Sequence, residues 1–271
     1  MRNRVNSYFV HKISALLLVL ILVVSFTSSA FAEYVPASNT AWEAVYHKQS
    51  LVSAAYGNGV YVAADGSGIV KVSFDAQEWN NVQLPDGKSM SSIVFGKSKF
   101  IGTSQGSLLT SEDGQHWKSI ELSEGDQLNV IIFNGEQFIA VGKGGYICMS
   151  TDGIVWQVHK SPLLEDKEII KIVAANGKFV CTNSIYADQL YVSSDGIDWN
   201  EVIPLEGYRN YENLASNDSV FYVSSSSYES TSGASVAASF VSEDGVNWSK
   251  KEEYLPGFSD LTSDVNRFIS E

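Results

Sequence analysis

The sequence predicts an all-β protein that forms a single β-propeller of six four-stranded blades. Three observations carry this prediction. A box of the form S-x-D-G-x-x-W occurs four times, and a strand-turn-strand pattern lies upstream of each copy. All six tryptophans of the 271-residue chain occupy the same position of the repeat. Repeats of about 40 residues that hold four short strands are typical of propeller blades.

The boxes mark the turn between the third and fourth strand of each repeat. Their aspartates are expected to accept backbone N–H groups within that turn, and their tryptophans to cover neighbouring strands. The alternative, catalytic or metal-binding aspartates, is disfavoured because copies spread around a ring cannot meet at one site. A degenerate copy at Ser73 has Ala76 in place of the glycine. The residues concerned are Asp75, Asp113, Asp152, Asp195, Asp244, Trp42, Trp79, Trp117, Trp156, Trp199 and Trp248.

The first half of each repeat predicts two more strands. Each of six segments has an apolar run, a short polar turn such as Asn176-Gly177, and an aromatic residue that opens a second run. Asn and Gly tolerate the left-handed backbone of a tight hairpin, so the pattern indicates strand, turn and strand. The segments align without a gap: Leu51–Tyr61, Met90–Phe100, Leu128–Phe138, Ile169–Phe179, Tyr211–Phe221 and Phe258–Phe268.

The two ends of the chain are predicted to share the sixth blade. The last repeat stops at Glu271, after its first two strands and without a box. Residues 34–46, with Trp42 at the box position, supply a third and fourth strand. Pairing with Phe258–Ser270 would close the ring and leave no exposed sheet edge. The alternative is a truncated, open arc.

Residues 1–32 have the pattern of an export signal. Three cations precede the apolar run Ile13–Phe26, and Ala30-Phe31-Ala32 is an A-x-A cleavage pattern. We expect cleavage and secretion into the medium or cell-wall space, leaving one domain, residues 33–271. An uncleaved anchor is the alternative, although the run is shorter than the roughly 20 residues of a membrane span. Losing three cations changes the net charge from −13 to −16. Such acidity disfavours nucleic acid and anionic lipid as partners, and we expect a monomer.

The boxes resemble those of the Asp-box, or BNR-type, propellers. That group includes sialidases, sortilin-type receptor ectodomains and photosystem assembly factors; its commoner box has one more residue between the aspartate and the tryptophan. The resemblance covers nearly the whole chain after residue 32 and implies the fold rather than an activity. Sialidases of this group grip the substrate carboxylate with three arginines. Only Arg209 and Arg267 follow the predicted signal, which excludes that reaction.

No metal site or cofactor is expected. The histidines after the signal, His47, His116 and His159, lie in different repeats, and no H-x-H, H-E-x-x-H or C-x-x-C spacing occurs. Cys148 and Cys181 fall in predicted strands and are expected to be free, buried thiols. Since an exported protein can form disulfides, a bond between them is the alternative.

The face opposite the boxes is the predicted binding face, because repeats four and five have their longest loops there. Exposed tyrosines beside carboxylates suit stacking against sugars or anchoring a protein. We therefore predict a non-catalytic binding or assembly module for an extracellular protein or glycan. The alternatives are a solvated acidic rim with a flexible Ser-rich insertion over 224–235, a glycosidase that uses Asp166 and Glu206, and a structural envelope protein. The candidate contact residues are Glu165, Asp166, Tyr186, Glu206, Tyr208, Arg209, Tyr211 and Tyr228.

Overall fold

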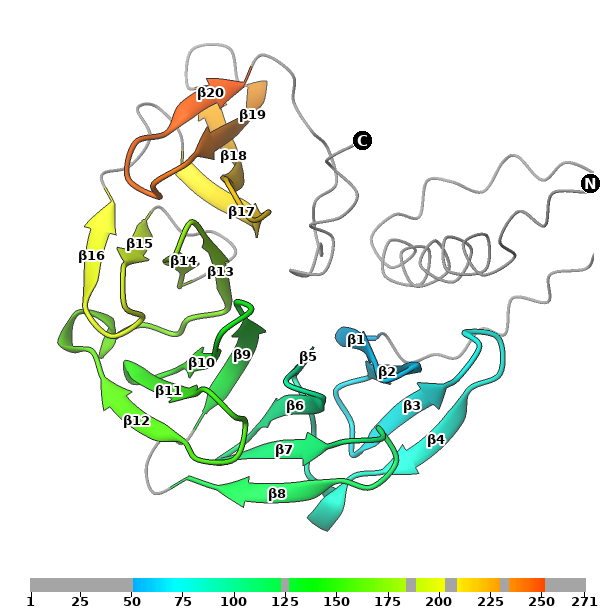
Figure 1. Ribbon diagram of the computed structural model, residues 1–271. Helices are drawn as coiled ribbons and strands as arrows, with labels where there is room; N and C mark the ends of the chain where they lie inside the picture. Colours follow the sequence, from blue (N-terminus) through cyan, green and yellow to red (C-terminus); the bar gives the residue numbers. More distant parts are fainter. Residues whose placement is uncertain (1–50, 123–126, 184–188, 203–208, 230–233, 252–271) are drawn as a thin grey trace, which may run out of the picture.

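The computed structural model describes residues 51–122, 127–183, 189–202, 209–229 and 234–251. These residues form five four-stranded antiparallel sheets, in each of which the strand order follows the sequence (Figure 1). We call the sheets blades 1 to 5. The prediction of an all-β chain built from four-stranded units is therefore confirmed. Trp42 and the two segments predicted to form a sixth blade lie outside the described residues, so the blade count stays a prediction.

Every blade consists of four consecutive strands. Blade 1 contains β1 (Ser53–Gly57), β2 (Val60–Ala64), β3 (Ile69–Ser73) and β4 (Asn80–Gln83). Blade 2 contains β5 (Ser92–Gly96), β6 (Lys99–Ser104), β7 (Ser107–Ser111) and β8 (Lys118–Glu121). Blade 3 contains β9 (Leu128–Phe133), β10 (Phe138–Gly142), β11 (Tyr146–Ser150) and β12 (Gln157–Lys160). Blade 4 contains β13 (Lys171–Ala175), β14 (Lys178–Thr182), β15 (Leu190–Ser193) and β16 (Trp199–Val202). Blade 5 contains β17 (Arg209–Ser216), β18 (Phe221–Glu229), β19 (Ala234–Ser242) and β20 (Ser249–Lys251).

The blades are arranged around a common centre. The first strands β1, β5, β9, β13 and β17 lie on the inside of the arc, and the last strands lie on the outside (Figure 1). The first strands of successive blades contact one another. Short 3-10 helices, η1 (Pro85–Gly87) and η2 (Pro162–Leu164), occur in two of the connections between blades. No helix among the described residues is long and apolar enough to cross a membrane.

The turns between the first two strands follow the Asn-Gly signal. Asn58 and Gly59 have φ values of 50° and 79°, and Asn176 and Gly177 have values of 50° and 70°. Two successive residues with positive φ make the tight turn whose twist matches a hairpin. In blade 1 the turn joins the paired residues Gly57 and Val60, as the sequence predicts.

The connections lie on two opposite faces. The Asn58 Nδ2 atom donates to the carbonyl oxygens of Ser98 and Glu112, at 3.2 and 3.0 Å, which brings first-to-second-strand turns and a box turn together. On the other side, the turn after β10 bridges to the loop before β13 through Lys143 and Glu168. We call the first side the box face and the second the loop face.

The core lies between adjacent blades. One apolar cluster joins Val62 and Val72 of blade 1 to Phe100 of blade 2. The buried Cys148 and Cys181 occupy two further clusters, and both thiols are free, which confirms that prediction. Burial raises the pKa of Cys148 to about 12 and that of Cys181 well above its usual value.

Blade 5 does not support the alternative of a flexible Ser-rich insertion over 224–235. Residues of that stretch form strand instead: β18 continues to Glu229 and β19 begins at Ala234. Their register runs unbroken to the pair formed by these two residues. Serine is tolerated here because the partner strand supplies a regular hydrogen-bonding ladder opposite it, and ladder pairing outweighs the weak intrinsic preference of serine for strands.

Candidate functional site

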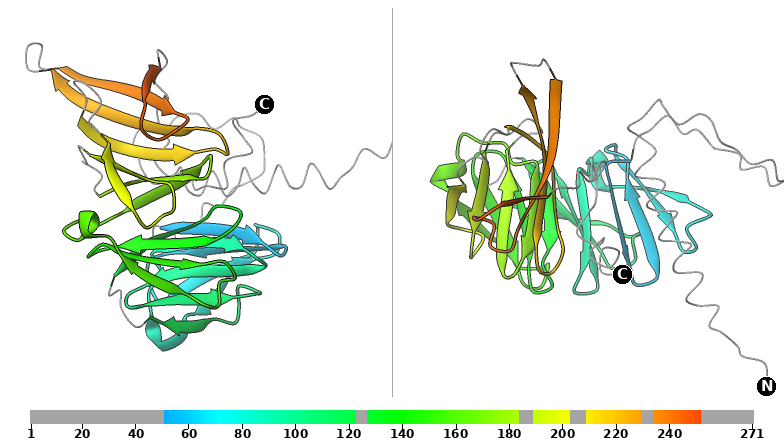
Figure 2. Two further views of the ribbon diagram at one scale, coloured as in Figure 1. Left: turned by 60° about the vertical axis from the view of Figure 1, so that its left-hand side comes forward. Right: turned by 90° about the horizontal axis from the view of Figure 1, so that it is seen from above.

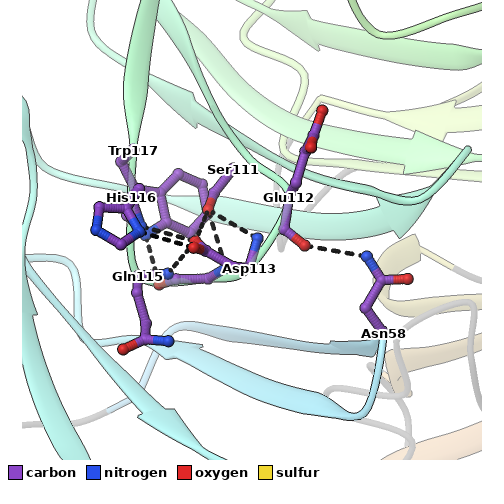
Figure 3. A network of polar contacts seen from close by, with 8 residues as sticks. Asn58, Ser111, Glu112, Asp113, Gln115, His116 and Trp117 are labelled. Carbon is purple, nitrogen blue, oxygen red and sulfur yellow. Dashed lines mark hydrogen bonds and ion pairs between the residues drawn. The ribbon is translucent and has the colours of Figure 1, made fainter.

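The box of blade 2 shows how the repeated carboxylates are used (Figure 3). The Asp113 Oδ1 atom accepts the backbone N–H groups of Gln115 and His116 at 2.9 and 2.8 Å. The Ser111 hydroxyl donates to the same oxygen at 3.1 Å and accepts the N–H of Gly114 at 2.9 Å. The Trp117 Nε1 group donates to the Gly114 carbonyl at 2.7 Å. Serine, aspartate, glycine and tryptophan therefore form one closed turn.

The same carboxylate bonds recur in the other four described boxes. In blade 3, the N–H groups of Val155 and Ile154 donate to Asp152 and hold the pKa of its carboxyl below the usual value. In blade 5, hydrogen bonds from Asn247 and Val246 lower the pKa of Asp244 further. A carboxylate that is ionised and occupied by its own turn has a structural role. Equivalent contacts surround Asp75 and Asp195.

The box turns of blades 2 to 5 also pack against the preceding blade, which sequence reasoning did not anticipate. A Cβ on Gly114 would stand 2.7 Å from the Val62 Cγ2 atom of blade 1. A Cβ on Gly245 would stand 2.8 and 2.9 Å from methyl carbons of Val180 and Val192 in blade 4. The box glycine thus serves both a left-handed turn and a close contact between blades.

The carboxylates of the loop before β13 are largely paired with lysines. Glu165 accepts the Lys160 ammonium at 2.6 Å, and this hydrogen bond lowers the pKa of Glu165. Glu168 lies 3.3 Å from the Lys143 ammonium. Asp166 is exposed between them. The Lys160 ammonium also lies 5.4 Å from the centre of the Tyr146 ring.

The remaining candidate contact residues fall into two groups. Tyr186, Glu206 and Tyr208 lie outside the described residues. Arg209 and Tyr228 lie in strands β17 and β18 rather than in loops. Both strands belong to blade 5, where β17 has eight residues and β18 has nine.

Tyr211 requires a correction. It was expected to be an exposed contact residue, but it lies in β17 with 2% of its surface exposed. Its ring belongs to the apolar cluster that contains Leu214 and Phe221. The repeat carries the signal for this, because Tyr211 aligns with Met90 and Leu128, which are also buried.

A polar network near the inner strands of blades 2 to 4 was also missed. The Ser91 and Thr103 hydroxyls are 2.9 Å apart, and Thr103 donates to the Asn129 carbonyl at 3.3 Å. The Asn129 side chain donates to the Ile169 carbonyl at 3.0 Å and to Glu168 at 3.3 Å. Polar residues at two successive copies of one repeat position, 91 and 129, are the sequence signal that could have revealed it.

Unused hydrogen-bonding groups gather at one repeat position on the loop face. Buried oxygen atoms of Asp65, Ser104 and Asn183 have no partner among the described residues. Each of the three residues lies four positions after the aromatic residue that opens the second strand of its repeat. This position is at the loop-face end of that strand. Buried polar atoms are normally paired, so these three positions have hydrogen-bonding capacity that the described residues do not use. No cluster of three potential metal ligands occurs within the described part of the chain.

Comparisons with known proteins agree with the fold described above. A family model described as the DUF6242 beta propeller domain matches residues 34–168. YCF48 bound to D1 peptide is similar with a TM-score of 0.54 and 13% identity, over 75% of this chain and 82% of that one. The GH74 xyloglucanase from Xanthomonas campestris is similar with a TM-score of 0.52 and 14% identity, over 74% and 38%. Chaetomium thermophilum Raptor is similar with a TM-score of 0.50 and 12% identity, over 76% and 20%. No curated protein matches the sequence. Together with the five blades, these likenesses define the chain as a β-propeller protein.

Proposed function

We propose that this β-propeller is a non-catalytic binding module that engages an extracellular protein or glycan on its loop face. One observation carries the proposal: β18 and β19 form a ribbon that projects past the other blades (Figure 2). Each of the two strands has nine residues, whereas their counterparts β2 and β3 have five. The connection between these strands belongs to the loop face, so the projection is on that side.

The projecting ribbon suits recognition because it makes blade 5 different in strand length from the other blades. Variable segments on a rigid scaffold are where propellers and other repeat folds carry their binding residues. The register places Tyr228 opposite Ser235 and Glu229 opposite Ala234 in the outer part of the ribbon. Two predicted contact residues, Arg209 and Tyr228, therefore lie on elongated strands of one blade.

The state of Glu165 on the loop face argues against this carboxyl as the acid of a glycoside hydrolase. A general acid needs a carboxyl whose pKa is raised, so that it holds a proton near neutral pH. The hydrogen bond from Lys160 instead lowers the pKa of Glu165. The likeness to a xyloglucanase concerns the fold alone, and hydrolysis remains the alternative that the experiment below tests.

We further propose that residues 34–46 and 258–270 complete a sixth blade, and that residues 1–32 direct export. The family model begins at residue 34, two positions after the last residue of the A-x-A pattern, which supports a propeller that starts near there. In blade 1, Val52 and Tyr56 are 49% and 37% exposed. Phe95, the counterpart of Tyr56, packs on the preceding blade at Gly57. The exposure of Val52 and Tyr56 supports the proposal that a further blade packs against blade 1, as blade 1 packs against blade 2.

The experiment compares the wild-type protein with two variants on a glycan array and a peptide array. In the first variant an Asn-Gly turn replaces residues 227–236 and joins the paired residues Ser226 and Ala237. In the second, Ile154→Ser changes an exposed residue of the box face. We expect the shortened ribbon to weaken binding by about tenfold or more, and Ile154→Ser to leave it unchanged.

A reducing-sugar assay on the same proteins separates binding from hydrolysis. We expect no sugar release from glycans that bind. Sugar release by the wild-type protein that is lost in the variant Asp166→Asn would show that the protein is a glycosidase. Equal binding by the wild-type protein and the shortened variant would show that the ribbon is not the recognition element.

A further inference from the structure

The turn between β9 and β10 contains an asparagine whose side-chain oxygen bonds to the backbone of its own turn. The Asn134 Oδ1 atom accepts the backbone N–H groups of Glu136 and Gln137 at 3.0 and 2.8 Å. Its Nδ2 group donates to no group in the described part of the chain. The next residue, Gly135, has a φ of 94°, and a Cβ placed there would meet nothing within 4 Å. The side-chain carbonyl is therefore polarised, the amide nitrogen has no partner in the described part of the chain, and the space beside the Gly135 Cα atom is open.

We infer that Asn134 is a site of spontaneous deamidation, a covalent modification that proceeds through a succinimide. Hydroxide removes the proton from the Gly135 nitrogen, which attacks the Asn134 Cγ atom and forms a new C–N bond. The Cγ–Nδ2 bond then breaks, and Nδ2 takes a proton from water and leaves as ammonia. Water opens the ring at either carbonyl and yields aspartate or isoaspartate.

The two N–H donors explain why this asparagine is favoured. Negative charge develops on Oδ1 when the nitrogen attacks Cγ, and donors already aimed at that oxygen stabilise the charge as it forms. Gly135 adds to the effect, because a residue without a Cβ presents no obstacle to the ring that forms.

Two other Asn-Gly pairs of the chain lack this arrangement. The Asn58 Nδ2 group donates to the Ser98 and Glu112 carbonyls of the next blade, at 3.2 and 3.0 Å. The Asn176 Nδ2 group donates to the Ser219 and Glu243 carbonyls of the next blade, at 2.6 and 2.9 Å. In both, the nitrogen that must leave is held by two contacts between blades, so folding protects these residues.

Asn217 provides the opposite contrast. Its Oδ1 atom accepts the N–H groups of Ser219 and Val220 at 2.9 and 2.8 Å, which reproduces the pattern at Asn134. The next residue, however, is Asp218. Its Cβ hinders ring formation, and its negative charge disfavours removal of the backbone proton. The Asn217 Nδ2 group also donates to the Tyr222 hydroxyl at 3.5 Å. Asn217 therefore tests whether a polarised carbonyl is sufficient when the next residue is not glycine and the amide nitrogen has a partner.

The test follows all four asparagines in one sample. The folded protein is incubated at mildly alkaline pH, and digestion and mass spectrometry report deamidation at each site; isoaspartate is identified by enzymatic methylation. We expect Asn134 to react about tenfold faster than Asn58, Asn176 or Asn217. In denaturant, the three Asn-Gly sites should react at similar rates and Asn217 should stay slow.

Two results would overturn the inference. One is deamidation of Asn58 or Asn176 in the folded protein at a rate equal to that of Asn134. The other is an Asn134 rate that does not fall when Gly135→Ala places a methyl group beside the attacking nitrogen. The variant Asn134→Asp, which is one of the products, serves as the reference for mass and chromatographic position.

Discussion

Replacement of the box glycine of blade 2 by alanine tests the contact between blades quantitatively. Gly114 has a φ of 72°, and a Cβ there would lie 2.7 Å from the Val62 Cγ2 atom. A left-handed conformation costs an alanine about 1–2 kcal/mol. Overpacking of a tight core contact costs about 1–3 kcal/mol more. Gly114→Ala should therefore lower the free energy of unfolding by roughly 2–5 kcal/mol.

The matched control is Gly59→Ala. Gly59 has a φ of 79°, but a Cβ there would meet nothing within 4 Å, so only the backbone cost of about 1–2 kcal/mol applies. Urea titrations followed by tryptophan fluorescence give both free energies of unfolding. Since about 1 kcal/mol shifts the Tm of a chain of this size by roughly 2–4 °C, calorimetry should also separate the two variants. Equal losses in both would refute the packing of the box turn on the preceding blade.

Three further predictions follow from the same contacts. Asn176→Ala removes two hydrogen bonds to the next blade and should lower the Tm by several degrees, whereas an unchanged Tm would mean that these bonds do not hold the blades together. The lowered pKa of Asp195 means that its stabilising effect is complete above the unfolded pKa of about 3.9 and is lost as the pH falls below it. Asp195→Asn should therefore reduce stability at pH 7 more than at pH 2, and an equal loss at both values in denaturant titrations would contradict this. Because burial raises the pKa values of Cys148 and Cys181, a thiol reagent should modify them only after unfolding; rapid modification of the native protein would show that they are accessible.

Local signals made most of the blade structure predictable. The Asn-Gly turns and the boxes each depend on a few neighbouring residues, so their spacing alone marks four strands in every repeat. Contacts between blades were not predictable in this way. The bonds from Asn58 to Ser98 and Glu112 span 40 and 54 residues and depend on how successive sheets are stacked.

The candidate site was predicted less well, and Tyr211 shows why. A tyrosine near loop carboxylates suggested an exposed contact, yet the gapless repeat alignment already placed Tyr211 with the buried Met90 and Leu128. Repeat position was the stronger signal because equivalent positions in stacked blades meet the same neighbours. The serines of β18 suggested a flexible loop, yet they lie in a strand. Their strand conformation depends on pairing with β19 rather than on local preference.

The central claim is that the ribbon of β18 and β19 recognises a partner on the loop face. Its most direct test is the dissociation constant of the shortened-ribbon variant for the strongest array ligand, measured beside wild type and Ile154→Ser. The proposal predicts a constant about tenfold higher or more for the shortened ribbon and an unchanged constant for Ile154→Ser. The claim would be contradicted by a shortened variant that binds as tightly as wild type, or by a loss confined to Ile154→Ser.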